Sequence, residues 1–147
     1  YCTRETTGQV YAFGATGISQ LESAYAQNAK DTNQYVAQIE SGNFYIEKGY
    51  NLSKTEKIIK HVINEIMCNY YLSWSDAAKK FQVSEKEIKA TVELEESRLQ
   101  DFAADGLLEF NSNEITVTKT GRFFVRNIAA SFDPSLKNAV QKFSKSL

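Results

Sequence analysis

The sequence predicts a mainly α-helical α+β fold with a small β-hairpin and a winged-helix-like domain from about residue 51. Three observations support this: two serine–glutamate capping boxes, three apolar stripes with helical spacing, and two short apolar runs around an asparagine-containing turn. Helices followed by a hairpin are the element order of a winged helix, whose second and third helices form a helix-turn-helix pair. The first fifty residues stand outside that module.

The first stretch of the chain predicts a loop, a strand and a turn. Residues 1–8 are polar and threonine-rich, which is typical of a loop. Residues 10–13 form a short apolar run that predicts a buried strand. Residues 14–19 then predict a tight turn, because Gly14 and Gly17 permit backbone shapes and close approaches that a Cβ atom would block.

A short helix and a brief extended segment follow. Asp31 and Gln34 fit the N-cap and third positions of a capping arrangement. Gly42 stands where a helix-ending glycine is common. We therefore expect a helix between these signals, and then a brief strand or ordered connection at residues 44–46.

The clearest predicted element is a helix at about residues 54–72. Ser53 and Glu56 form a capping box at its start. The apolar residues behind this box recur with helical spacing: Ile58, Ile59, Val62, Ile63, Ile66, Met67, Tyr70 and Tyr71. A second, shorter helix is expected at about residues 75–81, with its apolar side toward the core.

A third helix follows the second capping box, which Ser84 and Glu87 form. The residues 105–106 (Asp-Gly) end this helix. Its apolar stripe consists of Ile88, Val92, Leu99, Phe102 and Ala103. We interpret the whole stretch as one helix.

A hairpin and a last helix complete the module. Residues 107–110 and 115–118 are apolar and rich in β-branched side chains, and the Asn-Ser-Asn turn at 111–113 separates them. Gly121 opens the last helix, whose apolar residues are Phe123, Phe124, Val125, Ile128 and Ala129. Residues 134–147, which begin with the single proline, form a weakly amphipathic tail.

Composition and charge exclude several classes of protein. The 147 residues are 42% hydrophobic and 24% charged, which excludes wholesale disorder. The net charge of −1 disfavours a strongly basic nucleic-acid binder, and the third helix itself is acidic. No apolar run approaches the length of a membrane span. We expect neither a nucleic-acid nor a membrane partner. Lys119, Arg122 and Arg126 have two possible interpretations. They can form a solvated helix face, or they can contact a phosphate or a carboxylate.

The reactive residues form no recognisable catalytic or metal-binding set. Cys2 and Cys68 lie far apart and suggest two free thiols in a reducing, cytoplasmic compartment. His61 is the single histidine and falls on the polar face of the first long helix, so we expect it to be solvated. We predict no catalytic residue and no metal site in the chain.

The chain begins Tyr1-Cys2-Thr3 and its single methionine is Met67. It starts inside sequence with a structured pattern. We therefore expect a piece of a longer protein, so that a function inferred for this chain can belong to that parent.

Three strings carry a resemblance to a known family. They are Phe-Gly-Ala-Thr-Gly-Ile-Ser at 13–19 with Ala-Tyr-Ala-Gln-Asn at 24–28, Asp-Gly-Leu at 105–107 ahead of Ile-Thr-Val-Thr at 115–118, and the run from Gly121 to Asp133. In order and spacing they resemble the C-terminal half of oxygen-independent coproporphyrinogen III oxidase. That family consists of radical S-adenosylmethionine (SAM) dehydrogenases of haem biosynthesis, and the resemblance covers about residues 1–133.

The resemblance implies a domain arrangement and an activity for the parent. Residues 1–50 would be the C-terminal end of the catalytic barrel domain and its connection, and residues 51–133 would be a domain over the barrel mouth. The parent would oxidatively decarboxylate coproporphyrinogen III to protoporphyrinogen IX with a 4Fe-4S cluster and SAM. The cluster motif C-x3-C-x2-C is absent from this chain, so the fragment alone would bind no cofactor and be inactive. Residues 134–147 match the family poorly and receive no role.

The same resemblance implies site residues. Ile18 matches an isoleucine whose neighbourhood contacts SAM, and Gly14 and Gly17 would let that loop approach the ligand. Tyr25 and Asn28 are candidates for contact with the substrate, coproporphyrinogen III. Gly17 stands where some relatives have alanine. Two alternatives stay open: a haem chaperone of the same radical SAM family, and a winged-helix interaction or nucleic-acid-binding module.

Overall fold

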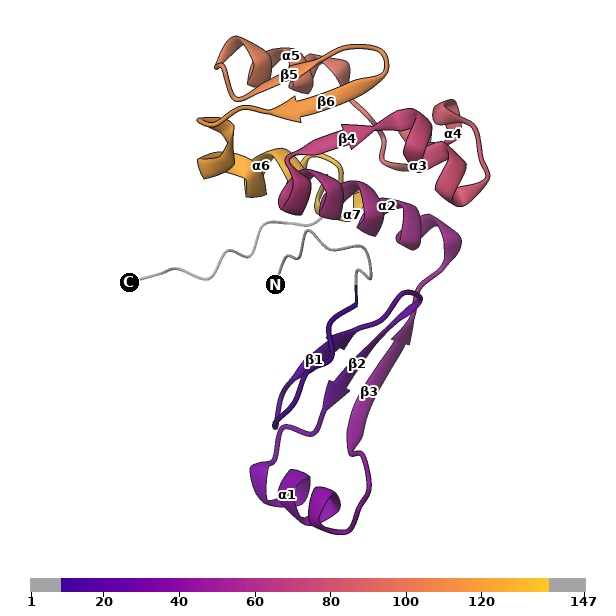
Figure 1. The fold of residues 1–147 in the computed structure, drawn as a ribbon, viewed down its shortest axis with the longest axis vertical. Helices are drawn as coiled ribbons and strands as arrows, with labels where there is room; N and C mark the ends of the chain where they lie inside the picture. The colour runs from indigo at the N-terminus through magenta and orange to yellow at the C-terminus, as the bar shows by residue number, and fades with distance from the viewer. Residues whose placement is uncertain (1–8, 138–147) are drawn as a thin grey trace. The chain divides into compact units, whose positions relative to one another are not determined.

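The structure, a computed structural model, describes residues 9–137 and divides them into two compact units, one ending at Lys57 and the other beginning at Ile58 (Figure 1). The expected α+β mixture is confirmed, but residues 9–137 contain two three-stranded antiparallel sheets where the sequence predicts one small hairpin. The predicted loop at residues 1–8 and most of the predicted tail lie outside the described residues.

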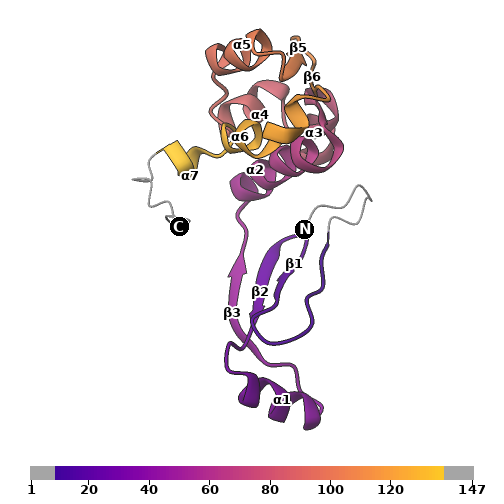
Figure 2. The same cartoon turned by 90° about the vertical axis from the view of Figure 1, so that its left-hand side faces the viewer.

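The first unit is a three-stranded antiparallel sheet with one helix. Its elements are β1 (Ile18–Gln20), β2 (Ala24–Asn28), α1 (Thr32–Glu40) and β3 (Ile46–Asn51), and the strand order is β1-β2-β3. Figure 2 shows α1 at the end of this sheet, in the connection from β2 to β3. The register of β2 and β3 shifts between Gln27 and Asn28, so a bulge lies at the end of β2.

The predicted limits of the helix α1 are confirmed. The Asp31 side chain accepts a hydrogen bond from the Gln34 backbone N–H at 2.8 Å, which satisfies one of the unpaired donors at the helix start. After the helix, Gly42 adopts a φ of +76°, a left-handed conformation that suits glycine.

The predicted buried strand at residues 10–13 is wrong. Val10 pairs with Gln20 in a single isolated bridge, and the side chains of Tyr11 and Phe13 are 66% and 88% exposed. An apolar run becomes a buried strand only when other elements cover it. Among residues 9–57, Ala29 is the one buried hydrophobic side chain of this unit, so no core is present to cover the run.

The second unit is mostly helical. Its helices, with α2 beginning just before the division, are α2 (Lys54–Asn64), the π-helical η1 (Glu65–Asn69), α3 (Trp74–Phe81), α4 (Glu85–Thr91), α5 (Glu96–Ala104), the 3-10 helix η2 (Gly121–Phe124), α6 (Val125–Ala130) and α7 (Pro134–Lys137). Its strands are β4 (Tyr71–Ser73), β5 (Leu108–Phe110) and β6 (Glu114–Val117), in the antiparallel order β4-β6-β5. The predicted hairpin is therefore confirmed as β5 and β6, and Figure 1 shows a third strand, β4, beside it.

One contiguous hydrophobic core holds the second unit together. Its members come from almost every element and include Ile58, Val62, Ile66, Leu72, Trp74, Ile88, Val92, Leu99, Leu108, Ile115, Ile128 and Phe132. Trp74 and Phe132 are the largest of these, and both are 1% exposed. Burial of apolar side chains at this density is the main stabilising contribution to such a unit.

The first predicted helix of the module is too long. The α-helix ends at Asn64, one π-helical turn follows, and Tyr70 adopts a left-handed conformation with φ +59°. Leu72 then lies in β4, where it is 1% exposed and pairs with Ile115 of β6. The run of apolar residues in the sequence continues from the helix into the strand. A buried strand and the core-facing side of a helix both consist of apolar residues, so the pattern does not show where one ends and the other begins.

The third predicted helix is in fact two helices. The helix α4 ends at Thr91, and Glu93 has a φ of +47°. The Leu94 backbone N–H bonds to the Lys89 carbonyl at 3.0 Å, which closes the end of α4 as in a Schellman motif before α5 begins at Glu96. A glutamate holds the position that glycine commonly occupies, so the residue types did not indicate this break.

Candidate functional site

The loop between residues 12 and 17 is held in one shape by backbone hydrogen bonds. Gly14 and Thr16 both have positive φ angles, +97° and +64°. The Gly17 N–H donates to the Gly14 carbonyl at 3.3 Å, and the Thr16 N–H donates to the Ala29 carbonyl at 2.8 Å. The Gly14 N–H donates to the Tyr35 hydroxyl of α1 at 3.0 Å, so the helix also positions the loop.

Asn28 fixes this loop from the end of β2. Its side-chain amide nitrogen donates to the carbonyls of Gly14 at 2.9 Å and Ala12 at 3.2 Å. Its backbone N–H donates to the Gly17 carbonyl at 2.9 Å. Both side-chain contacts are made within the protein and position the loop. Contact of Asn28 with a substrate therefore remains a prediction.

The two glycines of the loop differ in their surroundings. A Cβ atom at Gly17 would lie 3.0 Å from the Ala12 Cβ and 3.1 Å from the Gly14 carbonyl oxygen. A side chain at Gly17 would therefore require these neighbours within the protein to shift by a few tenths of an ångström. A Cβ atom at Gly14 would meet no atom within 4 Å, so its φ of +97° is the requirement there and the space beside it is open.

Ile18 and Tyr25 lie on the same face of the three-stranded sheet. Ile18 and Gln20 are two residues apart in β1, so their side chains point to the same face of the sheet. Gln20 is paired directly with Tyr25 of β2, whose side chain therefore points to that face as well. Ile18 is 51% exposed and Tyr25 is partly buried. Burial raises the pKa of the Tyr25 hydroxyl, which keeps it protonated near neutral pH as a hydrogen-bond donor. The fold thus brings Ile18, Tyr25 and the glycine loop into one part of the first unit.

His61, in the second unit, is less exposed than its place on a polar helix face predicts. Its side chain is 15% exposed and its ring meets the Phe81 ring edge-on at 5.5 Å. Its Nδ1 atom lies 3.3 Å from the Lys80 Nζ and 3.7 Å from a Glu65 carboxylate oxygen. The prediction of a solvated histidine is wrong, because α3 packs over α2 and covers the ring.

The surroundings of His61 lower its pKa. Burial is the largest cause, the nearby Lys80 ammonium adds to it, and the Glu65 carboxylate opposes both. The imidazole is therefore neutral near pH 7. Within residues 9–137, no group of three or more His, Cys, Asp or Glu side chains has a spacing suited to a metal ion.

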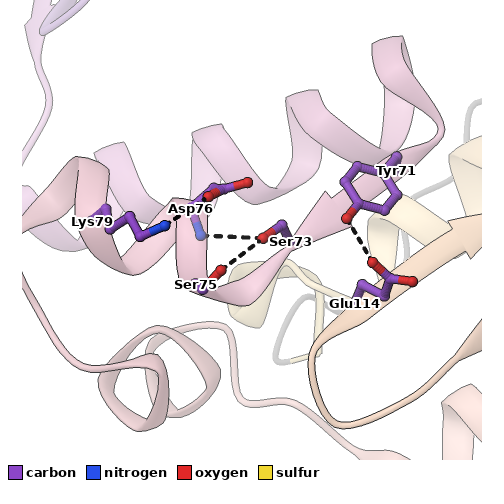
Figure 3. A network of polar contacts seen from close by, with 6 residues as sticks. All are labelled: Tyr71, Ser73, Ser75, Asp76, Lys79 and Glu114. Atoms are coloured by element: carbon purple, nitrogen blue, oxygen red, sulfur yellow. Dashed lines mark hydrogen bonds and ion pairs between the residues drawn. The ribbon is translucent and has the colours of Figure 1, made fainter.

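A polar network joins the start of α3 to β4 and β6 (Figure 3). The Tyr71 hydroxyl donates to the Glu114 carboxylate at 2.7 Å, which raises the Tyr71 pKa because ionisation would break this bond. The Ser73 hydroxyl accepts the Asp76 backbone N–H at 3.2 Å and caps α3. These side chains are partly or fully exposed and bind one another. The network fixes strand and helix ends and has no feature of a catalytic centre.

The start of the last helix presents two aromatic rings to solvent. Phe123 is 88% exposed and Phe124 is 48% exposed, whereas the sequence predicts both on the apolar side of that helix. The cause is the 3-10 turn η2, whose tighter winding places residues 122–124 outward before α6 begins. The sequence does not predict that Phe123 and Phe124 are surface residues. It indicates only their neighbours Arg122 and Arg126 as exposed.

No helix among the described residues is long and apolar enough to cross a membrane. Residues 52–124 match the family described as HemN C-terminal domain. Oxygen-independent coproporphyrinogen III oxidases from Helicobacter pylori and from Synechocystis are similar to the chain. The first is 36% identical over 147 residues, 100% of this chain and 31% of the relative. The second is 34% identical over 148 residues, 99% of this chain and 32% of the relative.

A solved structure shows the same fold. Coproporphyrinogen III oxidase (HemN) from Escherichia coli, described as a radical SAM enzyme, aligns with a TM-score of 0.71 and 28% sequence identity over 86% of this chain and 29% of that chain. The chain thus spans about a third of the length of the relatives that it matches. Residues 52–124, about half of the chain, are therefore similar to the HemN C-terminal domain family.

Proposed function

We propose that the chain is the C-terminal part of an oxygen-independent coproporphyrinogen III oxidase. The activity of the whole protein would be the oxidative decarboxylation of two propionate groups of coproporphyrinogen III to vinyl groups, which gives protoporphyrinogen IX. The observation that supports this most directly is the similarity along the whole chain, 36% identity over 147 residues with a relative of that name. The haem chaperone alternative has no comparable support, because each relative reported above is named an oxidase.

The finer domain assignment belongs to the same proposal. Residues 51–133 would form a winged-helix-like domain, and the order of α2, β4, α3, α4 and the β5–β6 hairpin supports this assignment. The sheet order β4-β6-β5 places the strand after the first helix beside the hairpin. Residues 1–50 would complete the end of a radical SAM barrel domain, and the exposed apolar side chains of their sheet are consistent with a further covering element.

The residues of this chain fit the two proposed cofactors differently. A 4Fe-4S cluster needs more thiolates than the two cysteines of the chain can supply, so its ligands must come from elsewhere in a longer protein. SAM fits better, because Ile18 offers exposed apolar surface and the space beside Gly14 is open. When bound, SAM supplies the radical that abstracts a propionate hydrogen. Ile18 would pack against SAM, and the Asn28 amide would hold the loop in place.

Contact with the substrate is proposed for Tyr25 and Asn28. Tyr25 lies on the same sheet face as Ile18, and its protonated hydroxyl can donate to a propionate carboxylate. Asn28 would act through the loop that it positions. We also propose a cytoplasmic location with no nucleic-acid or membrane partner. The net charge of −1 argues against a nucleic-acid partner.

An anaerobic activity assay tests the proposal. The longer reading frame that contains this chain is expressed, and the purified protein is supplied with SAM, a reductant and coproporphyrinogen III. We expect protoporphyrinogen IX together with a C-x3-C-x2-C motif upstream of residue 1. A reconstituted longer protein that leaves coproporphyrinogen III unchanged would contradict the proposal and favour a binding role.

A further inference from the structure

An exposed surface of mixed character lies at the junction of η2 and α6. It consists of Arg122, Phe123, Phe124 and Arg126, all exposed, and is called the Arg–Phe surface below. Phe123, at 88% exposure, is almost entirely in solvent. Large aromatic side chains are rarely left so open on a rigid element without a partner.

The Arg–Phe surface is built on a rigid support. Gly121 is buried, and a Cβ atom there would lie 1.8 Å from the Leu107 carbonyl oxygen, so η2 starts in direct contact with the segment before β5. The Gly121 N–H donates to the Thr118 hydroxyl at 3.0 Å, and that hydroxyl donates to the Gly106 carbonyl at 2.7 Å. The surface is thus held in place in the absence of any ligand.

Arg122 is itself oriented by its contact with an aromatic ring. The centre of its guanidinium lies 4.5 Å from the centroid of the Tyr70 ring. Arg122 is nevertheless exposed, and a guanidinium carries five N–H donors, more than this one ring contact uses. Within residues 9–137, no carboxylate forms an ion pair with Arg122 or Arg126, whereas Arg98 is paired with Glu95 at 3.2 Å.

The spacing places the charges and the rings next to one another. Arg122 and Phe123 lie in the 3-10 helix η2 and Arg126 lies in the first turn of α6, so one run of five residues carries all three. This run presents two guanidinium groups, neither of them ion-paired with a carboxylate among residues 9–137, together with two exposed phenylalanine rings. The ligand that suits such a surface carries carboxylates at the edge of an apolar ring system.

We propose that the Arg–Phe surface binds the propionate-bearing edge of a tetrapyrrole. Arg122 and Arg126 would bind propionate carboxylates, and Phe123 would cover the adjacent pyrrole ring. This inference rests on the proposed function, because coproporphyrinogen III carries four propionates on its ring. The Arg–Phe surface lies wholly within the second unit.

A binding titration of the 147-residue chain tests the inference. The probe is coproporphyrin III, the air-stable oxidised form of the ring system, and binding is followed by its fluorescence. We expect R122Q and R126Q each to weaken binding about tenfold, because each removes a charge-assisted contact. F123S should weaken binding as well. The matched control R98Q, on another helix, should bind as the unaltered chain does.

Two further measurements keep the result decisive. Coproporphyrin tetramethyl ester, which lacks the charged carboxylates, should bind much more weakly than the free acid and should not distinguish R122Q from R98Q. Circular dichroism checks that the variants fold. If R122Q is unfolded, R126Q carries the test. Absent binding, or equal binding by all variants, would overturn the inference.

Assays of the longer protein separate this inference from the proposed function. We expect R126Q to raise KM for coproporphyrinogen III about tenfold with little change in kcat. An active enzyme whose KM is unchanged in R122Q and R126Q overturns the Arg–Phe inference alone. A longer protein that does not decarboxylate coproporphyrinogen III, while arginine-dependent binding of coproporphyrin III persists, overturns the proposed function and leaves the tetrapyrrole surface standing.

Discussion

At the scale of single residues, Ile18 tests the proposed SAM contact. The change Ile18→Asp should weaken SAM binding by the longer protein about tenfold or more, because it places an unpaired carboxylate against the ligand. Equilibrium binding of SAM measures the effect. Val36→Asp is the matched control, because Val36 is similarly exposed, at 45%, on α1. Equal affinities for the two variants would remove Ile18 from the site.

Among the glycines of residues 9–137, Gly121 is the one at which an added Cβ atom would meet the closest neighbours. Gly121→Ala should destabilise the second unit by about 1–3 kcal/mol or more, because its Cβ would meet the Leu107 carbonyl group at 1.8 and 2.7 Å and backbone must move. Gly106→Ala is the comparison, with a φ of +69° and open space, and should cost about 1–2 kcal/mol. Urea denaturation gives both values. A smaller loss for Gly121→Ala than for Gly106→Ala would contradict the packing argument.

His61 makes stability depend on pH. Its pKa is lower in the folded chain than the ordinary 6.5, chiefly through burial and then through Lys80, with Glu65 opposing. As the pH falls, His61 therefore binds a proton in the unfolded chain at a higher pH than in the folded chain. Stability from this group is fully present above about pH 6.5 and is lost as the pH falls below that value toward the folded pKa.

The measurement is the unfolding free energy of the chain between about pH 5 and 7.5. His61→Gln should remove most of the slope, because the chain has no second histidine. Lys80→Gln should reduce the slope only in part, since burial is the larger cause. An unchanged slope in His61→Gln would show that another group titrates.

At the scale of elements, the starts of α1, α3 and α4 follow side-chain chemistry, whereas the ends of α3 and α4 do not. Ser84 accepts the Glu87 backbone N–H at 3.2 Å, as its capping box predicts. The ends of α3 and α4 are closed at Gln82 and Glu93, which have φ values of +54° and +47°. These residue types rarely mark a helix end, so a sequence pattern gives no warning there.

The N-cap of α4 gives an element-scale prediction. Ser84→Ala should lower stability by about 1 kcal/mol, because the Glu87 N–H loses its acceptor. Ser84→Asp keeps an acceptor beside the helix start and should restore most of the loss. Denaturant titration of the three chains compares them. Equal midpoints for the serine and alanine chains would show that solvent replaces the cap at no cost.

At the scale of the whole molecule, the two units differ in how they are stabilised. The second has a continuous core that runs from Ile58 to Phe132. In the first, Ala29 is the one buried hydrophobic residue among residues 9–57, and Phe13 and Phe44 are 88% and 87% exposed. A three-stranded sheet without a buried face has little to offset the entropy of ordering its chain.

We therefore expect the two units to behave differently when separated. A polypeptide of residues 52–137 should unfold cooperatively and show dispersed amide resonances. A polypeptide of residues 9–57 should lack both properties. Circular dichroism and a proton–nitrogen correlation spectrum of each polypeptide provide the test. A folded 9–57 polypeptide would contradict the claim that this unit depends on a covering element.

The sequence by itself determined the parts that depend on local chemistry. The N-caps at Asp31, Ser53, Ser73 and Ser84 each rest on a side chain that reaches a backbone N–H three residues on. Three of these starts were predicted from residue types. The hairpin β5–β6 and the apolar stripe of α2 were also predicted from the sequence. Backbone geometry sets the spacing of the apolar residues in a strand and in a helix. The resemblance to the family came from three strings of residues, and the 36% identity over 147 residues to a relative of that name agrees with it.

Tertiary structure alone decided the features that depend on distant partners. Leu72 became a strand residue because Ile115, far along the chain, supplied the backbone partner. His61 is partly buried because Phe81 of α3 lies against its ring. Asn28 holds the loop because the Gly14 carbonyl folds back to the Asn28 amide. Phe123 points into solvent because the contact of Gly121 with Leu107 fixes the start of η2. Such contacts join residues that are remote in sequence, so no local pattern of residue types records them.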